Sequence, residues 1–241
     1  MEIASRQDHV GSGETVHGVP QCRRVIIVGA GGLGAEVWNW AHDAWGRAGV
    51  VFSGFLDADP GRPRATGSGR VIGDPATHQP QADEGFVLAI GIQHVRRRVV
   101  EILEAKGARF LSLVHPTAIV APTATVGTGA VLCPYAIVSA AVRLGRFTLV
   151  NYHASLGHDA ATADFAVLSP YATLGGHARA GADAFLGLHA SLGPGKTLGD
   201  GSKISANSCA LVDVPPRSLV YGVPGRVSPL LSADPVGSPN T

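Results

Sequence analysis

Two histidines and an aspartate lie close together in the stretch HASLGHDA, residues 153–160. His153 and His158 are five residues apart, and Asp159 directly follows the second histidine. Imidazole and carboxylate groups at this spacing can bind a metal ion, or they can act as a general base and its orienting partner. Polar residues of this kind also occur on ordinary solvated surface, so the surrounding pattern has to decide among these three interpretations.

A repeat of six residues surrounds this stretch and runs from Val114 to Ala210. Steps of six from Val114 give 17 positions, of which 14 are Val, Leu or Ile. The exceptions are Thr162, Ala180 and Ala210. Helices repeat at 3.6 residues and strands alternate at two, whereas a period of six is typical of a parallel β-helix. Three such units form one triangular coil, so residues 18 apart are expected on adjacent coils.

A different pattern precedes the repeat. Three full strands, a short one at RVIGD (70–74) and a last one at RFLSLV (109–114) alternate with two helical patterns, at 32–45 and 95–107. This alternation predicts a small, mostly parallel α/β sheet. We therefore expect a Rossmann-like domain over 23–113 and a β-helix over 114–227. The segments 1–22 and 228–241 are polar and are expected to be tails without fixed structure.

Composition excludes several classes of partner. The chain has 19 basic and 18 acidic residues, which predicts no nucleic-acid partner. No apolar run approaches the roughly 20 residues that a membrane span needs, and the first residues lack the apolar core of a secretion signal. Three widely spaced cysteines fit neither a disulfide framework nor a zinc motif. A cytoplasmic protein is expected.

Glycines follow the first predicted strand in the pattern G-x-G-x-x-G. Gly29, Gly31 and Gly34 at this position let the backbone approach a phosphate at a helix N-terminus. Asp57 lies 23 residues after Gly34, near the spacing of a ribose-binding acid. About 90 residues of α/β pattern match half of a dinucleotide fold, which favours a mononucleotide site. NAD binding and a purely structural glycine turn remain alternatives.

Five motifs together resemble a known family. HPTAIV (115–120) and YGVPGR (221–226) resemble the opening and closing motifs of the left-handed β-helix of hexapeptide acyltransferases. GAGGLG (29–34), FLDADPG (55–61) and AIGIQHVRRRV (89–99) resemble the nucleotide-binding domain of bacterial nucleotide-aminosugar N-acetyltransferases of the bacillosamine- and perosamine-pathway type. The resemblance implies a homotrimer that uses acetyl-CoA, or another short acyl-CoA, as co-substrate and a nucleotide-linked aminosugar as acceptor.

The resemblance also implies roles for individual residues. His158 matches the family's catalytic histidine, and Asp159 matches the acidic residue after it, which is usually glutamate. The acyl-CoA groove would include Gly176, Gly187, Pro194, Lys196 and Arg226. The nucleotide-sugar site would include Gly29, Gly31, Gly34, Asp57, Gly91 and Arg96. The chain departs from the family at Leu33 and Val167, where some relatives carry histidines.

The 18-residue coil also tests the metal interpretation. It places His158 beside Gly176, Asp159 beside His177, and His153 beside Tyr171 and then His189. A carbonic-anhydrase relative on this fold binds zinc through H-x4-H and a histidine two coils earlier. This motif can be aligned with the chain in two ways, and each alignment lacks one histidine. With His153 and His158 as the pair, the earlier histidine is replaced by Thr117. With His153 as the earlier histidine and His189 starting the pair, the second histidine is replaced by Pro194.

A zinc site needs three protein ligands, so we predict no metal. The resemblance together with the His158–Asp159 step instead predicts an N-acyltransferase with His158 as general base. Three alternatives remain open: an acyltransferase for another amine or alcohol, a γ-carbonic-anhydrase-like metal enzyme, and a non-catalytic scaffold or sensor.

Overall fold

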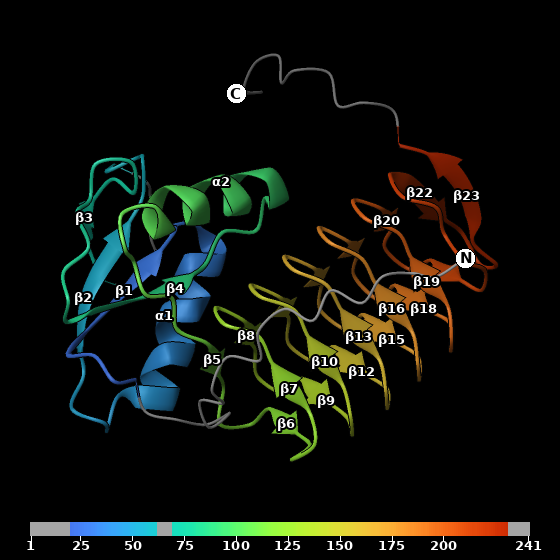
Figure 1. Cartoon of the computed structure of the whole chain (residues 1–241), viewed down its shortest axis with the longest axis horizontal. Helices are drawn as coiled ribbons and strands as arrows, with labels where there is room; N and C mark the ends of the chain where they lie inside the picture. The colour runs from blue at the N-terminus through green and yellow to red at the C-terminus, as the bar shows by residue number, and fades with distance from the viewer. Residues whose placement is uncertain (1–19, 62–68, 231–241) are drawn as a thin grey trace, which may run out of the picture.

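The computed structural model describes residues 20–61 and 69–230 of the chain. Within these ranges an α/β domain is followed by a parallel solenoid of short strands (Figure 1). Of the expected tails, only residues 20–22 and 228–230 are described, and the rest lie outside the described residues.

A four-stranded parallel sheet, in the order β3-β2-β1-β4, forms the α/β domain. Alternate residues of β1 point to opposite faces, so Ile27 packs in the cluster that holds α1, whereas Ile26 packs with Val100 of α2. Both faces are thus covered, which explains why β1 and β4 are almost entirely buried. The elements are β1 (Arg24–Val28), α1 (Gly32–Trp45), β2 (Val51–Leu56), β3 (Val71–Gly73), β4 (Glu84–Leu88) and α2 (Gln93–Glu104).

Seventeen two-residue strands, β5 to β21, build the three faces of the solenoid. The first face holds β7 (Thr125–Val126), β10 (Arg143–Leu144), β13 (Ala161–Thr162), β16 (Arg179–Ala180) and β19 (Thr197–Leu198). The second face holds β5 (Leu113–Val114), β8 (Val131–Leu132), β11 (Leu149–Val150), β14 (Val167–Leu168), β17 (Phe185–Leu186) and β20 (Lys203–Ile204). The third face holds β6 (Ile119–Val120), β9 (Ile137–Val138), β12 (Ser155–Leu156), β15 (Thr173–Leu174), β18 (Ser191–Leu192) and β21 (Cys209–Ala210).

Strand pairing confirms the 18-residue coil. Leu149 pairs in parallel with Val131 on one side and with Val167 on the other. The aliphatic residue of each hexapeptide points inward and forms one continuous core. Thr162 interrupts this core, and its hydroxyl is satisfied by Thr148 at 2.9 Å. The predicted fold class, a small Rossmann-like domain followed by a left-handed parallel β-helix, is confirmed.

The corners between faces carry residues with positive φ at steps of six. His153, Asp159 and His177 all occupy this position, with φ between 57° and 59°. Non-glycine residues rarely adopt this conformation, although Asn, Asp and His do so more often than most. Backbone bonds to the preceding coil hold it in place, as in the His177 N–H donated to the His158 carbonyl at 2.8 Å. The corners therefore stack and project their side chains outward.

The α/β domain covers the second face of the solenoid. Val131, Leu149 and Val167 are buried in one cluster with Val37 of α1. At the far end, an antiparallel pair, β22 (Ser218–Tyr221) and β23 (Arg226–Pro229), continues the sheet of the second face. β23 thus extends two residues into the segment expected to be a tail. Neither described helix is long and apolar enough to cross a bilayer.

Candidate functional site

His158 and Asp159 form a hydrogen-bonded pair on the corner between β12 and β13. His158 Nδ1 lies 2.9 Å from Asp159 Oδ2. Because a carboxylate can only accept, Nδ1 donates in this bond, and the neutral form of the ring then has its lone pair on Nε2. This hydrogen bond lowers the pKa of the Asp159 carboxyl, and the charges of His177 and Arg143 act in the same direction. The pair can thus accept a proton at Nε2 and stabilise the resulting imidazolium.

Gly176 lies directly against the reactive side of this imidazole. A Cβ added at Gly176 would lie 2.7 Å from His158 Nε2, well inside van der Waals contact. The Gly176 N–H has no acceptor among the described residues. The site therefore combines a nitrogen lone pair with a neighbouring free backbone donor, which is an arrangement suited to acyl transfer.

His177 is a further functional candidate, for which the sequence alone indicates no role. Its Nε2 lies 3.8 Å from Asp159 Oδ2, and its ring meets the His158 ring edge-on at 5.0 Å. The 18-residue step from Asp159 to His177 was visible in the sequence, but spacing alone does not show which way an exposed ring turns. The structure brings both imidazoles to one carboxylate.

His153 lies apart from this cluster, on the corner between the second and third faces. Its ring stacks between Tyr135 and Tyr171 at centroid distances of 5.0 and 4.8 Å, and Tyr171 stacks on His189 at 4.7 Å. The predicted column of His153, Tyr171 and His189 is confirmed. The two histidines of the opening motif therefore lie on different corners of the solenoid.

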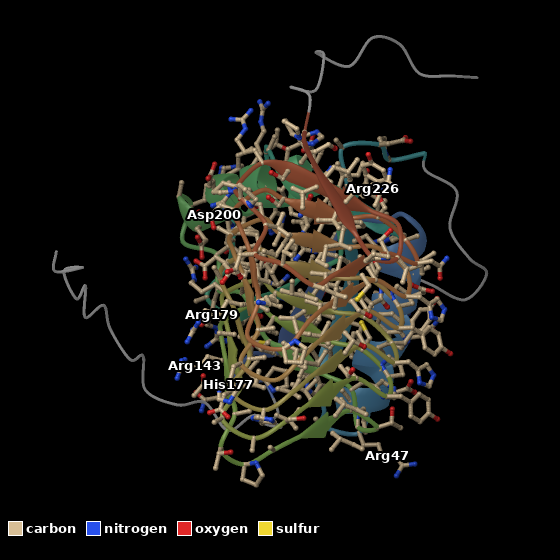
Figure 2. All side chains as sticks on the ribbon, turned by 90° about the vertical axis from the view of Figure 1, so that its right-hand side faces the viewer. Arg47, Arg143, His177, Arg179, Asp200 and Arg226 are labelled. Atoms are coloured by element: carbon tan, nitrogen blue, oxygen red, sulfur yellow. The ribbon has the colours of Figure 1, made fainter. Side chains whose placement is uncertain are left out.

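The residues expected to bind acyl-CoA fall on three different parts of the solenoid. Pro194 and Lys196 continue the corner of His158 and Gly176, and the Gly195 N–H bonds the Gly176 carbonyl at 2.8 Å. Gly187 lies on the corner that carries His153 and His189. Arg226 begins β23, on the opposite side of the solenoid from His177 in the view of Figure 2. Gly176, Pro194 and Lys196 thus lie in line with His158, whereas Gly187 and Arg226 do not.

The glycine loop lies at the carboxyl edge of the parallel sheet. Gly29 follows β1 with φ of 106°, and Gly31 caps α1. Asp57, which follows β2, accepts the Ala30 N–H at 2.7 Å and so holds this loop. Gly91 is exposed at the end of the segment after β4. The ends of three neighbouring strands thus converge, as in nucleotide-binding α/β folds.

Gly34 is a test of how tightly the glycine loop is packed. A Cβ at Gly34 would lie 2.1 Å from the Gly29 carbonyl oxygen, whereas a Cβ at Gly32 would meet nothing within 4 Å. We expect Gly34→Ala to lower the free energy of unfolding by about 1–3 kcal/mol through overpacking. The matched variant Gly32→Ala should leave it unchanged or slightly higher. Chemical denaturation measures both, and equal effects would contradict the close packing.

Comparisons with known proteins agree with this architecture. The family model described as the PglD N-terminal domain matches residues 24–103. The acetyltransferase domain of PglB from Neisseria gonorrhoeae FA1090 shares 30% identity and a TM-score of 0.77, covering 85% of this chain and 98% of that one. The chain belongs to the nucleotide-aminosugar N-acetyltransferases of the hexapeptide superfamily.

Two perosamine N-acetyltransferases extend the comparison within this family. PerB from Caulobacter crescentus, solved in complex with CoA and GDP-perosamine, has 26% identity and a TM-score of 0.77 over 85% of this chain and 96% of that one. GDP-perosamine N-acetyltransferase of Escherichia coli O157:H7 is 28% identical over 86 residues, which are 36% of this chain and 39% of that protein. The chain thus matches well under two thirds of that curated relative.

Two departures from the family pattern have structural explanations. Val167 is outward-facing on the second face, where the α/β domain buries it. His158 lies on the corner between the third and first faces, so a side chain on the second face points away from it. Leu33 packs against the same cluster from the first turn of α1, so it contributes to the core of the domain.

Arg96 is not where the nucleotide-sugar prediction requires it. Its side chain is 1% exposed and donates to the carbonyls of Ile90 and Phe147. Burial lowers the pKa of the guanidinium to about 10. The bond to Ile90 stays within the α/β domain and the bond to Phe147 reaches the solenoid, so Arg96 links the two domains. A buried group committed to internal carbonyls has no surface to offer a nucleotide.

Proposed function

We propose that the protein transfers an acetyl group, or another short acyl group, from CoA to the amine of a nucleotide-linked aminosugar. The observation that carries the proposal is the His158–Asp159 pair with Nε2 directed at Gly176. Family membership supports the reaction class, and the CoA and GDP-perosamine complex of PerB supports both substrate classes. A solved complex of the gonococcal PglB domain with acetyl coenzyme A supports acetyl-CoA.

The proposed reaction is direct attack of the amine on the thioester. The amine nitrogen forms a bond to the carbonyl carbon while His158 Nε2 takes its proton. In this proposal the Gly176 N–H donates to the carbonyl oxygen as negative charge develops there. When the C–S bond breaks, the thiolate takes the proton from the imidazolium, so CoA leaves as the thiol and His158 is restored. Asp159 holds the tautomer and stabilises the imidazolium.

Two other surfaces complete the proposal. The glycine loop with Asp57 and Gly91 would receive the nucleotide, and the corner through Pro194 and Lys196 would receive the pantetheine chain. The third face carries the exposed apolar residues Ile119 and Ile137, at 63% and 41% exposure. These support a homotrimer in which acyl-CoA lies between neighbouring solenoids.

Release of free thiol from acetyl-CoA, measured against a panel of aminosugars, tests the proposal. We expect turnover with a nucleoside diphosphate aminosugar, and at least tenfold less with the same sugar lacking its nucleotide. Equal rates for both would favour the alternative of an acyltransferase for small amines. Calorimetry with UDP and with GDP separates the two as well, because only the proposed function requires one of them to bind.

A further inference from the structure

His158, Asp159 and His177 form a cluster of three metal-ligand types on adjacent coils. Their ligand atoms all lie within 4.8 Å of one another. Asp159 Oδ2 lies between the two rings, 2.9 Å from His158 Nδ1 and 3.8 Å from His177 Nε2. The two corners are also joined by the backbone bond from His177 N–H to the His158 carbonyl. The side chains are therefore held near one another by the coil repeat itself.

Two imidazoles and one carboxylate match the ligands that Zn²⁺ accepts. Zinc binds His nitrogen at about 2.0–2.1 Å and carboxylate oxygen at about 2.0–2.2 Å, which places tetrahedral ligand atoms about 3.3 Å apart. The two nitrogen–oxygen separations, 2.9 and 3.8 Å, lie within about 0.5 Å of this value. All three side chains are free to adjust, since each is about half exposed or more. Solvent can supply the fourth ligand.

We propose that these three residues form a Zn²⁺-binding site whose occupation inhibits the protein. The inhibition rests on the proposed function, because it acts through His158. A metal ion bound at Nδ1 displaces the proton that Asp159 now accepts, and the remaining ring proton then lies on Nε2. The nitrogen beside Gly176 loses its lone pair and can no longer accept a proton from the amine. The ion is thus an inhibitor of transfer and has no part in the reaction.

The surrounding charge sets a limit on how tightly the ion binds. Asp159 contributes the one negative charge of the cluster, and Arg143 is the neighbouring cation that acts on it. In Figure 2, Arg143, His177 and Arg179 lie on the same side of the solenoid. Arg143 and Arg179 both extend from the first face, on either side of Ala161. Removing the positive charge of Arg143 should therefore strengthen zinc binding.

Calorimetric titration of the full chain with ZnCl₂ tests the site without any substrate. We expect one Zn²⁺ per chain, at least tenfold weaker binding in His177→Asn, and no binding of Mg²⁺, which prefers all-oxygen sites. His153→Asn is the matched control, because His153 is also an exposed histidine on a positive-φ corner. Absence of binding, or equal weakening by both substitutions, would overturn the proposal.

Thiol release in the presence of Zn²⁺ tests the inhibition. Each protein is compared with its own metal-free rate after chelation by EDTA. We expect Zn²⁺ to inhibit the wild type at the concentration found by calorimetry, and at least tenfold more Zn²⁺ to be needed for His177→Asn. Zinc that binds without inhibiting would overturn the inhibitory role. Absence of transfer in metal-free protein would instead count against the proposed function and leave the calorimetric result standing.

Discussion

Replacing His158 with alanine is expected to slow acyl transfer by about 10²–10⁴-fold, the range that general base catalysis contributes. The imidazole supplies the lone pair at Nε2, and no other described side chain lies hydrogen-bonded to Asp159 at comparable distance. The loss should fall on kcat and on kcat/KM alike, since the interaction is made in the transition state. Steady-state thiol release measures both constants.

His153→Ala is the control for this experiment. His153 lies on the same coil and is also exposed, but it stacks between tyrosines on a different corner. We expect its removal to leave the rate within a few-fold of the wild type. If His158→Ala retained activity within about tenfold of the wild type, His158 would not be the base. The His158–Asp159 pair would then be a surface ion pair of little energetic weight.

Replacing Gly176 with alanine is expected to lower kcat by about 10–10²-fold without unfolding the protein. The new Cβ would stand 2.7 Å from His158 Nε2 and 3.0 Å from its Cε1, so the ring has to move. Because the ring is exposed, it can swing aside at small cost to stability. Displacement of a catalytic group by about 1 Å can cost about 10²-fold in rate. Thermal unfolding together with thiol release distinguishes lost activity from lost fold.

A double-mutant cycle shows whether Gly176 acts through His158. In the His158→Ala background no ring is left to displace, so Gly176→Ala should cost much less than it does alone. An equal cost in both backgrounds would show that the methyl group interferes elsewhere, for example with the carbonyl oxygen of the acyl group. The cycle therefore separates placement of the base from any role of the Gly176 N–H.

Much of the candidate site follows from counting residues. Once the period of six is recognised, residues 18 apart must lie on adjacent coils, because each coil is closed by strand pairing. That step places Gly176 beside His158 and Tyr171 beside His153. The sequence likewise indicates the glycine loop, because the turn from β1 to α1 requires φ of 106° at Gly29 and a close approach at Gly34.

Other features depend on how side chains turn and how the domains dock. The spacing of the histidines does not match the three-histidine zinc motif considered in the sequence. The structure nevertheless brings His158, Asp159 and His177 together as a different set of possible metal ligands. Asp57 has the spacing of a ribose ligand, but one of its oxygens holds the Ala30 N–H. Local sequence patterns do not predict these side-chain orientations, because the rotamer of each side chain is selected by residues that the fold brings close in space.

The sequence by itself determined the solenoid, the order of the two domains and the alignment of His158 with Gly176. All three arise from local periodicity and chain connectivity. Only the tertiary structure decided that Arg96 is buried against Phe147 and that Val167 lies under the α/β domain. The physical reason is that contacts between domains join residues 50 or more positions apart, whose packing no local repeat encodes.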